Sequence, residues 1–107
     1  MKRLQPSSEN GALMRVKWSR KALLNLDYAV EYIAADNPAE AAEVAQRIWD
    51  ISQMLADQPG MGRPGRVADT RELVISGLPY ILPYIERAGT VIILRVMHTS
   101  MKWPKKF

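Results

Sequence analysis

The chain contains one histidine, His98, close to its carboxyl end. An imidazole gains and loses a proton near neutral pH, so this residue type can serve as a general acid or base in the cleavage of RNA. A strand-end histidine that is hydrogen-bonded to its neighbours explains the same residue equally well. The sequence contains no cysteine, and one histidine without cysteine does not indicate a zinc site. We therefore expect no metal and no cofactor.

Basic and aromatic residues accompany this histidine in the sequence. Guanidinium groups can hold phosphates and aromatic rings can stack on bases, so the mixture is typical of a surface that contacts nucleic acid. The residues concerned are Arg71, Tyr80, Tyr84, Arg87, Arg95, His98, Lys102, Trp103, Lys105 and Lys106. Arg63 and Arg66 lie in the Gly- and Pro-rich segment 57–69 and could also reach a phosphate. That segment lacks the GK[ST] sequence of a phosphate-binding loop.

Charge is distributed along the chain in three blocks. Residues 1–21 carry six Lys or Arg and one acid, residues 22–58 carry one Arg and seven acids, and residues 59–107 carry eight Lys or Arg and three acids. The net charge is +4. A basic region carried on an acidic one indicates an anionic partner for one side of the molecule. Ordinary solvation of surface charge explains the pattern equally well.

The length of 107 residues suits one domain with a modest core. Residues 1–13 are polar and have no periodicity, so we predict a flexible extension there and a single domain over 14–107. No run of about 18 apolar residues is present, so we expect no membrane-spanning helix. The absence of cysteine fits a reducing cytoplasm, where we expect the protein to act.

Capping residues and apolar periodicity predict two helices, which together contain most of the acidic residues of segment 22–58. Ser19 can cap a helix over 19–35, and Asn37 followed by Pro38 can start a second over 37–58. The connection is so short that the two helices must form an antiparallel hairpin. The apolar residues expected to be mostly buried in them are Leu23, Leu26, Val30, Ile33, Val44, Ile48, Ile51 and Leu55. Trp49 flanks the second stripe, either at the rim of the core or as a partner contact.

Runs of β-branched and aromatic residues predict strands at 14–18, 71–75, 80–86 and 91–98. Leu73, Ile85, Leu94 and Val96 are expected to be mostly buried. Pro83 cannot donate a ladder hydrogen bond, so that position must face an edge, a bulge or solvent. Arg95 stands in an apolar strand and must reach the open face of the sheet or find an internal partner. These elements predict an α+β fold of order β-α-α-β-β-β, a helix hairpin packed on an antiparallel sheet.

Four segments, taken together, resemble the RelE/ParE superfamily of bacterial toxins. They are WSRKALLNLDYAVEYIAADNPAEAA, PGMGRPGR, TRELVISGLPYILPY and ILRVMHTSMKWP, and the resemblance covers about residues 14–104. It implies the same β-α-α-β-β-β topology. It also implies the toxin of a type II toxin–antitoxin module, bound and neutralised by a small cognate antitoxin in a hetero-oligomer.

The superfamily contains two activities, and the resemblance is closer to the ParE-like members, which poison DNA gyrase. On that interpretation the target-binding residues are Arg63, Arg66, Arg87, Lys102, Trp103, Lys105 and Lys106. The alternative is a RelE-like mRNA interferase, a metal-independent endoribonuclease whose partners are the ribosome and mRNA. Its catalytic residues would be His98, Arg71, Arg95 and Tyr84.

Three departures from the superfamily bear on this choice. RelE-like nucleases use lysines from the second helix and the segment after it, whereas this chain has no lysine between Lys21 and Lys102. They often use a tyrosine near the carboxyl end, and no tyrosine follows Tyr84 here. Met101 occupies a position where members usually carry arginine, and the loss of that cation would weaken phosphate contact or catalysis.

Overall fold

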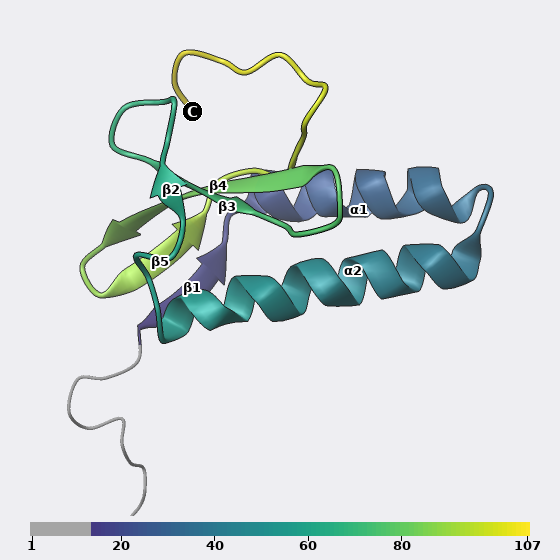
Figure 1. Cartoon of the computed structure of the whole chain (residues 1–107), viewed down its shortest axis with the longest axis horizontal. Coiled ribbons are helices and arrows are strands. Elements are labelled where there is room, and N and C mark those ends of the chain that lie inside the picture. The colour runs from purple at the N-terminus through teal and green to yellow at the C-terminus, as the bar shows by residue number, and fades with distance from the viewer. Residues whose placement is uncertain (1–13) are drawn as a thin grey trace, which may run out of the picture.

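The computed structural model describes residues 14–107, and the extension expected at 1–13 lies outside the described residues. Two helices form a hairpin that packs against one face of a sheet, as the α+β prediction required (Figure 1). In chain order the elements are β1 (Arg15–Trp18), α1 (Arg20–Ala34), α2 (Pro38–Gln53), the 3-10 turn η2 (Met54–Ala56), β2 (Arg63–Pro64), β3 (Arg71–Val74), β4 (Tyr80–Arg87), β5 (Thr90–Ile93) and β6 (Met97–His98). None of the helices described is long and apolar enough to cross a membrane.

Both helices begin where their capping residues predict. The Ser19 side chain accepts a hydrogen bond from the backbone N–H of Ala22, and Asn37 accepts one from Glu40, each at 3.0 Å. The second helix is shorter than predicted, because the α-helix ends at Gln53 and the tighter turn η2 follows it.

The core-facing side of α1 differs from the prediction at Leu23 and at Val30, which is only partly buried and does not belong to the core stripe. Its stripe is Ala22, Leu26, Ala29 and Ile33, and Leu23 is wrong as a core residue because 44% of it is exposed. Leu23 lies about 100° further round the helix than fully buried Ala22. The small side chain of Ala22 lets α1 approach its neighbours closely.

The sheet has the strand order β1-β5-β4-β3-β2, with β6 also paired to β4. Every pair is antiparallel except β1 and β5, which run parallel with Val16 opposite Val91. The expectation of a purely antiparallel sheet is therefore wrong at this edge. No tight turn joins β1 to β5, so no hairpin geometry requires them to be antiparallel.

The strand predicted over 91–98 is divided into β5 and β6, and both pair with β4. Opposite the break, the carbonyl oxygen of Pro83 accepts a hydrogen bond from Leu94 at 2.8 Å. Pro83 has no N–H to return, so its missing ladder bond falls at a bulge, one of the places predicted for it. The backbone N–H of Val96 donates instead to Asn25 Oδ1 at 3.1 Å.

The core lies between the helix hairpin and the sheet. Tyr80, Leu82 and Tyr84 of β4 face the helices, as their alternation predicts. In β5 the fully buried residues are Val91 and Ile93, whereas Leu94, just after the strand, is only partly buried. At the rim of the core, Trp49 stacks on Trp18 with ring centres 5.5 Å apart while 42% of Trp49 remains exposed.

Candidate functional site

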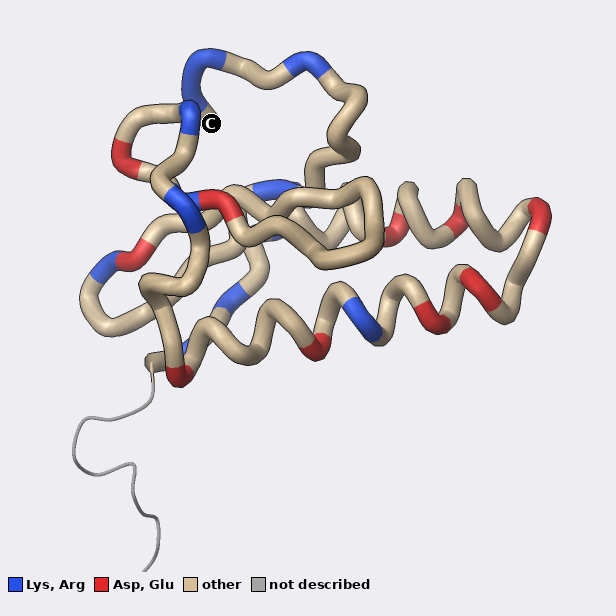
Figure 2. Tube along the Cα trace, viewed as in Figure 1, with Lys and Arg blue, Asp and Glu red and all other residues tan. Residues whose placement is uncertain are grey.

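Acidic and basic side chains separate in space as they do in the sequence. Figure 2 shows most Asp and Glu along the two helices, whereas most Lys and Arg lie on the strands, the loop around β2 and the carboxyl-terminal tail, residues 99–107. The candidate target-binding residues all belong to this basic part. A negatively charged partner would therefore bind the sheet and the tail, not the helix hairpin.

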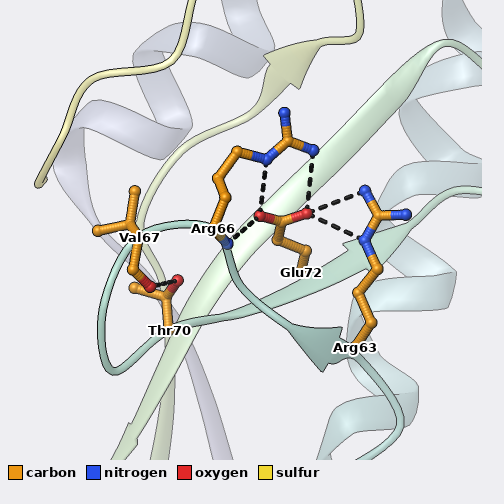
Figure 3. Close-up of polar contacts among 5 residues, drawn as sticks. All are labelled: Arg63, Arg66, Val67, Thr70 and Glu72. Atoms are coloured by element: carbon orange, nitrogen blue, oxygen red, sulfur yellow. Dashed lines mark hydrogen bonds and ion pairs between the residues drawn. The ribbon is translucent and has the colours of Figure 1, made fainter.

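Glu72 of β3 lies at the centre of an ion-pair cluster with two arginines (Figure 3). Its side chain is 2% exposed. Arg66 donates to it from Nε at 3.0 Å, from Nη2 at 3.1 Å and from the backbone N at 2.8 Å. Arg63 donates from Nε at 3.0 Å and from Nη2 at 2.9 Å. Burial alone would raise the pKa of Glu72, but the hydrogen bonds from Arg66 and Arg63 outweigh it and hold the pKa below its ordinary value of 4.5.

Two glycines allow the loop that carries Arg63 and Arg66 to pack closely against the sheet. The Gly62 N–H donates to the Tyr84 hydroxyl at 3.0 Å, and a Cβ at Gly62 would lie 2.7 Å from that oxygen. A Cβ at Gly65 would lie 2.1 Å from Thr70 Oγ1. The sequence GRPGR is therefore a structural unit: its glycines permit close contact and its arginines neutralise the buried Glu72.

The tail covers the other side of Arg66. The Trp103 ring centre lies 3.8 Å from the Arg66 guanidinium carbon, which places this guanidinium between Glu72 and the indole. Phe107 contacts the edge of Trp103 with ring centres 6.1 Å apart. Since Glu72 alternates with the core residue Leu73 along β3, this assembly lies on the face of the sheet away from the helices.

The structure therefore brings several candidate target-binding residues together. Arg63, Arg66 and Trp103 form one assembly, and Lys102, Lys105 and Lys106 are exposed on the tail that carries Trp103. Arg87 lies at the end of β4, away from the Arg63–Arg66–Trp103 assembly, and lines a second cavity that Lys106 of the tail also reaches.

His98 faces the opposite side of the molecule. It pairs with Tyr80 and contacts that ring edge-on, with ring centres 5.4 Å apart. Its Nδ1 lies 3.1 Å from the Ser100 backbone N and 2.7 Å from Ser100 Oγ. Together with Tyr28 and Tyr32 of α1 it lines a groove of about 430 Å³. We refer to it as the α1 groove.

The four residues of the nuclease alternative are not brought together. Arg71 and Tyr84 meet at Gly62, where Arg71 Nη1 donates to the Gly62 carbonyl at 2.7 Å. Tyr84 is fully buried, its hydroxyl donates to Pro59, and burial raises its pKa above the ordinary 10.0. Arg95 lies beside Phe107, and His98 lies in the α1 groove.

Two features were not predicted from the sequence. Glu72 was not recognised as the partner of Arg63 and Arg66, because strand alternation does not show which loop covers a strand. The α1 groove was also missed. Leu24 is followed at four-residue spacing by Tyr28 and Tyr32, which line the groove, and this spacing could have identified a second apolar stripe on the helix. These three side chains are 56%, 72% and 74% exposed.

The known proteins to which this chain is similar are described as toxins or as part of a toxin–antitoxin system. Y4kP of Sinorhizobium fredii, described as a candidate toxin, is 47% identical over 91 residues, which cover 85% of this chain and 94% of that protein. Toxin RelE2 of Caulobacter vibrioides is 33% identical over 88 residues, covering 82% and 98%. A solved chain of the chromosomal ParDE toxin–antitoxin system from P. aeruginosa superposes with a TM-score of 0.75 at 28% identity, covering 80% of this chain and 96% of that one.

A family model described as the ParE toxin of the type II toxin–antitoxin system parDE matches residues 16–103. That range runs from the second residue of β1 through β6 to Trp103, so it spans the fold and most of the basic face. The resemblance read from the sequence is confirmed: the chain belongs to the ParE toxin family of type II toxin–antitoxin systems, within the RelE/ParE superfamily.

Proposed function

We propose that this ParE-family toxin inhibits DNA gyrase and is neutralised by a cognate antitoxin. The observation that supports a binding mechanism over a catalytic one is the separation of His98 from the arginines. His98 lies in the α1 groove, whereas Arg63, Arg66 and Arg95 lie on the other face of the sheet.

Metal-independent cleavage of RNA needs a base at the 2′-hydroxyl, an acid at the leaving oxygen and cations on the phosphate, all within hydrogen-bond reach. Arg63 and Arg66 are already paired with Glu72, and the Tyr84 hydroxyl is enclosed by Gly62 and Pro59. His98 has Ser100 as its neighbour, and among residues 14–107 no arginine lines the α1 groove beside it. This arrangement favours a surface that binds a protein target.

The tail is the part of the surface best suited to hold gyrase. Lys102, Lys105 and Lys106 are exposed on it, and Trp103 is anchored by Arg66 and Phe107. Exposed cations around an aromatic anchor supply charge steering and a buried contact, which together are typical of a specific interface.

The α1 groove is the part best suited to hold the antitoxin. Tyr28 and Tyr32 line this groove, and together with Leu24 one turn earlier they form an exposed apolar stripe on α1. Such patches mark protein–protein contacts. We infer that an antitoxin segment, partly disordered alone, folds along this groove and across the sheet, with acidic residues toward the basic face.

Expression of the toxin without its antitoxin tests the proposed target. Inhibition of gyrase should produce filamentous cells with DNA damage while the mRNA pool stays intact. Rapid loss of mRNA without DNA damage would contradict the proposal and favour the ribonuclease. Co-expression of the adjacent small gene should restore growth in either case, so it serves as the control for toxin specificity.

A further inference from the structure

A second cavity lies at the end of the sheet where α1 begins. Its volume is about 530 Å³, and its walls come from the first turn of α1, residues 67–70, the adjoining ends of β4 and β5, and the end of the tail. Five cations line it: Arg20, Lys21, Arg87, Arg95 and Lys106. Asp69 is the one acidic residue in its wall. We refer to it as the basic cavity.

Asp69 can offset only one of these five positive charges. Within residues 14–107 none of the five cations makes an ion pair, in contrast to Arg63 and Arg66. Arg95 is partly buried and donates only to the Leu94 carbonyl, at 2.8 Å, while its guanidinium lies 5.3 Å from the Phe107 ring centre. Like charges around one cavity repel each other, so an anion bound among them would stabilise the arrangement.

The position of Arg20 and Lys21 supports a role in binding. They occupy the first turn of α1, where unpaired N–H groups and the helix dipole already make the potential positive. A cation there opposes the dipole and destabilises the helix slightly. The stability of α1 therefore does not explain these two residues, whereas an anion in the basic cavity does.

We propose that the basic cavity binds the phosphate backbone of a nucleic acid. Duplex DNA carries one negative charge per about 1.7 Å of its axis, so successive phosphates can meet cations that come from separate segments of this chain. Among the described residues that line the cavity, the one aromatic ring is Phe107, and it packs against Trp103 and Arg95, whereas five residues offer cations for phosphates. Binding should therefore be independent of base sequence. This inference goes beyond gyrase inhibition and does not depend on it.

The test is fluorescence anisotropy of the full-length chain with a labelled 20-base-pair DNA duplex and a labelled RNA of equal length. Two double variants remove cations of the cavity: Arg20→Gln with Lys21→Gln, and Arg87→Gln with Lys106→Gln. The matched control, Arg15→Gln with Lys17→Gln, removes two exposed cations of β1 outside the cavity. Circular dichroism checks that all three fold.

We expect each cavity variant to weaken binding by roughly ten- to a hundredfold at 0.1 M salt and to reduce the salt slope by about 2, one for each cation. The control variant should change the affinity and the salt slope much less than the cavity variants do. If the cavity variants lose affinity for both DNA and RNA, the cavity is a general site for the nucleic-acid backbone. If they lose affinity for the DNA duplex alone, the ligand is DNA. Either result supports the proposal.

Three outcomes would overturn it. One is equal weakening by the control, which would mean that only total charge matters. Another is displacement of the duplex by millimolar inorganic phosphate at matched ionic strength, which would identify a site for a single ion. The third is unchanged nucleic-acid binding together with lost antitoxin binding, which would assign the cavity to an acidic protein segment.

The Arg20 and Lys21 variant lies outside the proposed gyrase-binding residues, so its result is separate from that proposal.

Discussion

At the scale of single residues, Glu72 determines what the neighbouring arginines can do. Its carboxylate is buried beneath the loop that carries Arg63 and Arg66, and a buried carboxylate is stable only when it is paired and hydrogen-bonded. The two arginines are 52% and 46% exposed, so each still presents part of its guanidinium to a partner. Their first role is nevertheless structural.

Glu72→Gln should lower the free energy of unfolding at pH 7 by about 1–3 kcal/mol, because it leaves two arginines without their anion. The folded-state pKa of Glu72 is below 4.5, so its contribution is complete above 4.5 and is lost as the pH falls through the folded-state value. The difference between wild type and variant should therefore shrink in acid. Urea unfolding at pH 7 and pH 4 measures it, with exposed Glu86→Gln as control. Equal stability of the two variants at pH 7 would contradict the account.

Gly62→Ala should destabilise the fold by about 1–3 kcal/mol, a range typical of overpacking. The new methyl group would lie 2.7 Å from the Tyr84 hydroxyl and 2.9 Å from the Glu72 carbonyl oxygen. Gly60 is the matched control, since a Cβ there meets nothing within 4 Å. Thermal unfolding of both variants decides the point, and equal melting temperatures would show that the close contact at Gly62 is unimportant.

The residue types of this region could be predicted from the sequence, but their partners could not. Arg63 and Arg66 were recognised as phosphate-binding candidates because guanidinium groups suit phosphates. Their pairing with Glu72 depends on how the loop folds back over β3, and no local propensity specifies that path. Tyr84 illustrates the same difficulty, since its hydroxyl is used by residues 59 and 62, more than twenty positions away.

At the scale of elements, local signals were reliable and non-local ones were not. The capping residues Ser19 and Asn37 act within three residues, so both helix starts could be predicted. The parallel pairing of β1 with β5 joins residues about 75 positions apart, and the sequence carries no signal for its direction. Pro83 did predict an irregularity, and the bulge between β5 and β6 lies opposite it.

The α1 groove carries the prediction for antitoxin binding. Tyr28→Ala combined with Tyr32→Ala should weaken binding of the cognate antitoxin at least tenfold, because exposed tyrosines that become buried in an interface are frequent hot spots. Both side chains are largely exposed, so the fold should not change. Isothermal titration calorimetry at physiological salt provides the measurement. Met54→Ala, 46% exposed on η2, is the control and should bind like wild type. An unchanged affinity of the double tyrosine variant would place the antitoxin elsewhere.

At the scale of the whole molecule, the acidic helix hairpin and the basic sheet and tail present two different surfaces. This separation allows one toxin to meet an antitoxin and a target through different chemistry. It was visible in the charge blocks of the sequence, whereas the groove and the cavity arise only when distant segments meet.

Charge reversal of Lys102, Lys105 and Lys106 to glutamate should reduce toxicity, because it inverts the charge of the tail proposed to contact gyrase. Plating efficiency after induction measures the loss, which we expect to be at least tenfold. Reversal of Arg15 and Lys17 on β1 is the control, since those cations lie outside the proposed interface. If both sets reduce toxicity equally, net charge and not the tail is responsible.

The central claim is that the toxin acts by binding gyrase and not by proton transfer through His98. The most direct measurement compares purified wild type with His98→Gln in two assays, gyrase supercoiling of plasmid DNA and ribosome-dependent cleavage of mRNA. We predict that both proteins inhibit supercoiling to within about twofold and that neither cleaves mRNA. Loss of a general acid or base typically costs about 100- to 10,000-fold in rate. Cleavage of mRNA by the wild type that falls by that factor in His98→Gln, with supercoiling unaffected by either protein, would contradict the account.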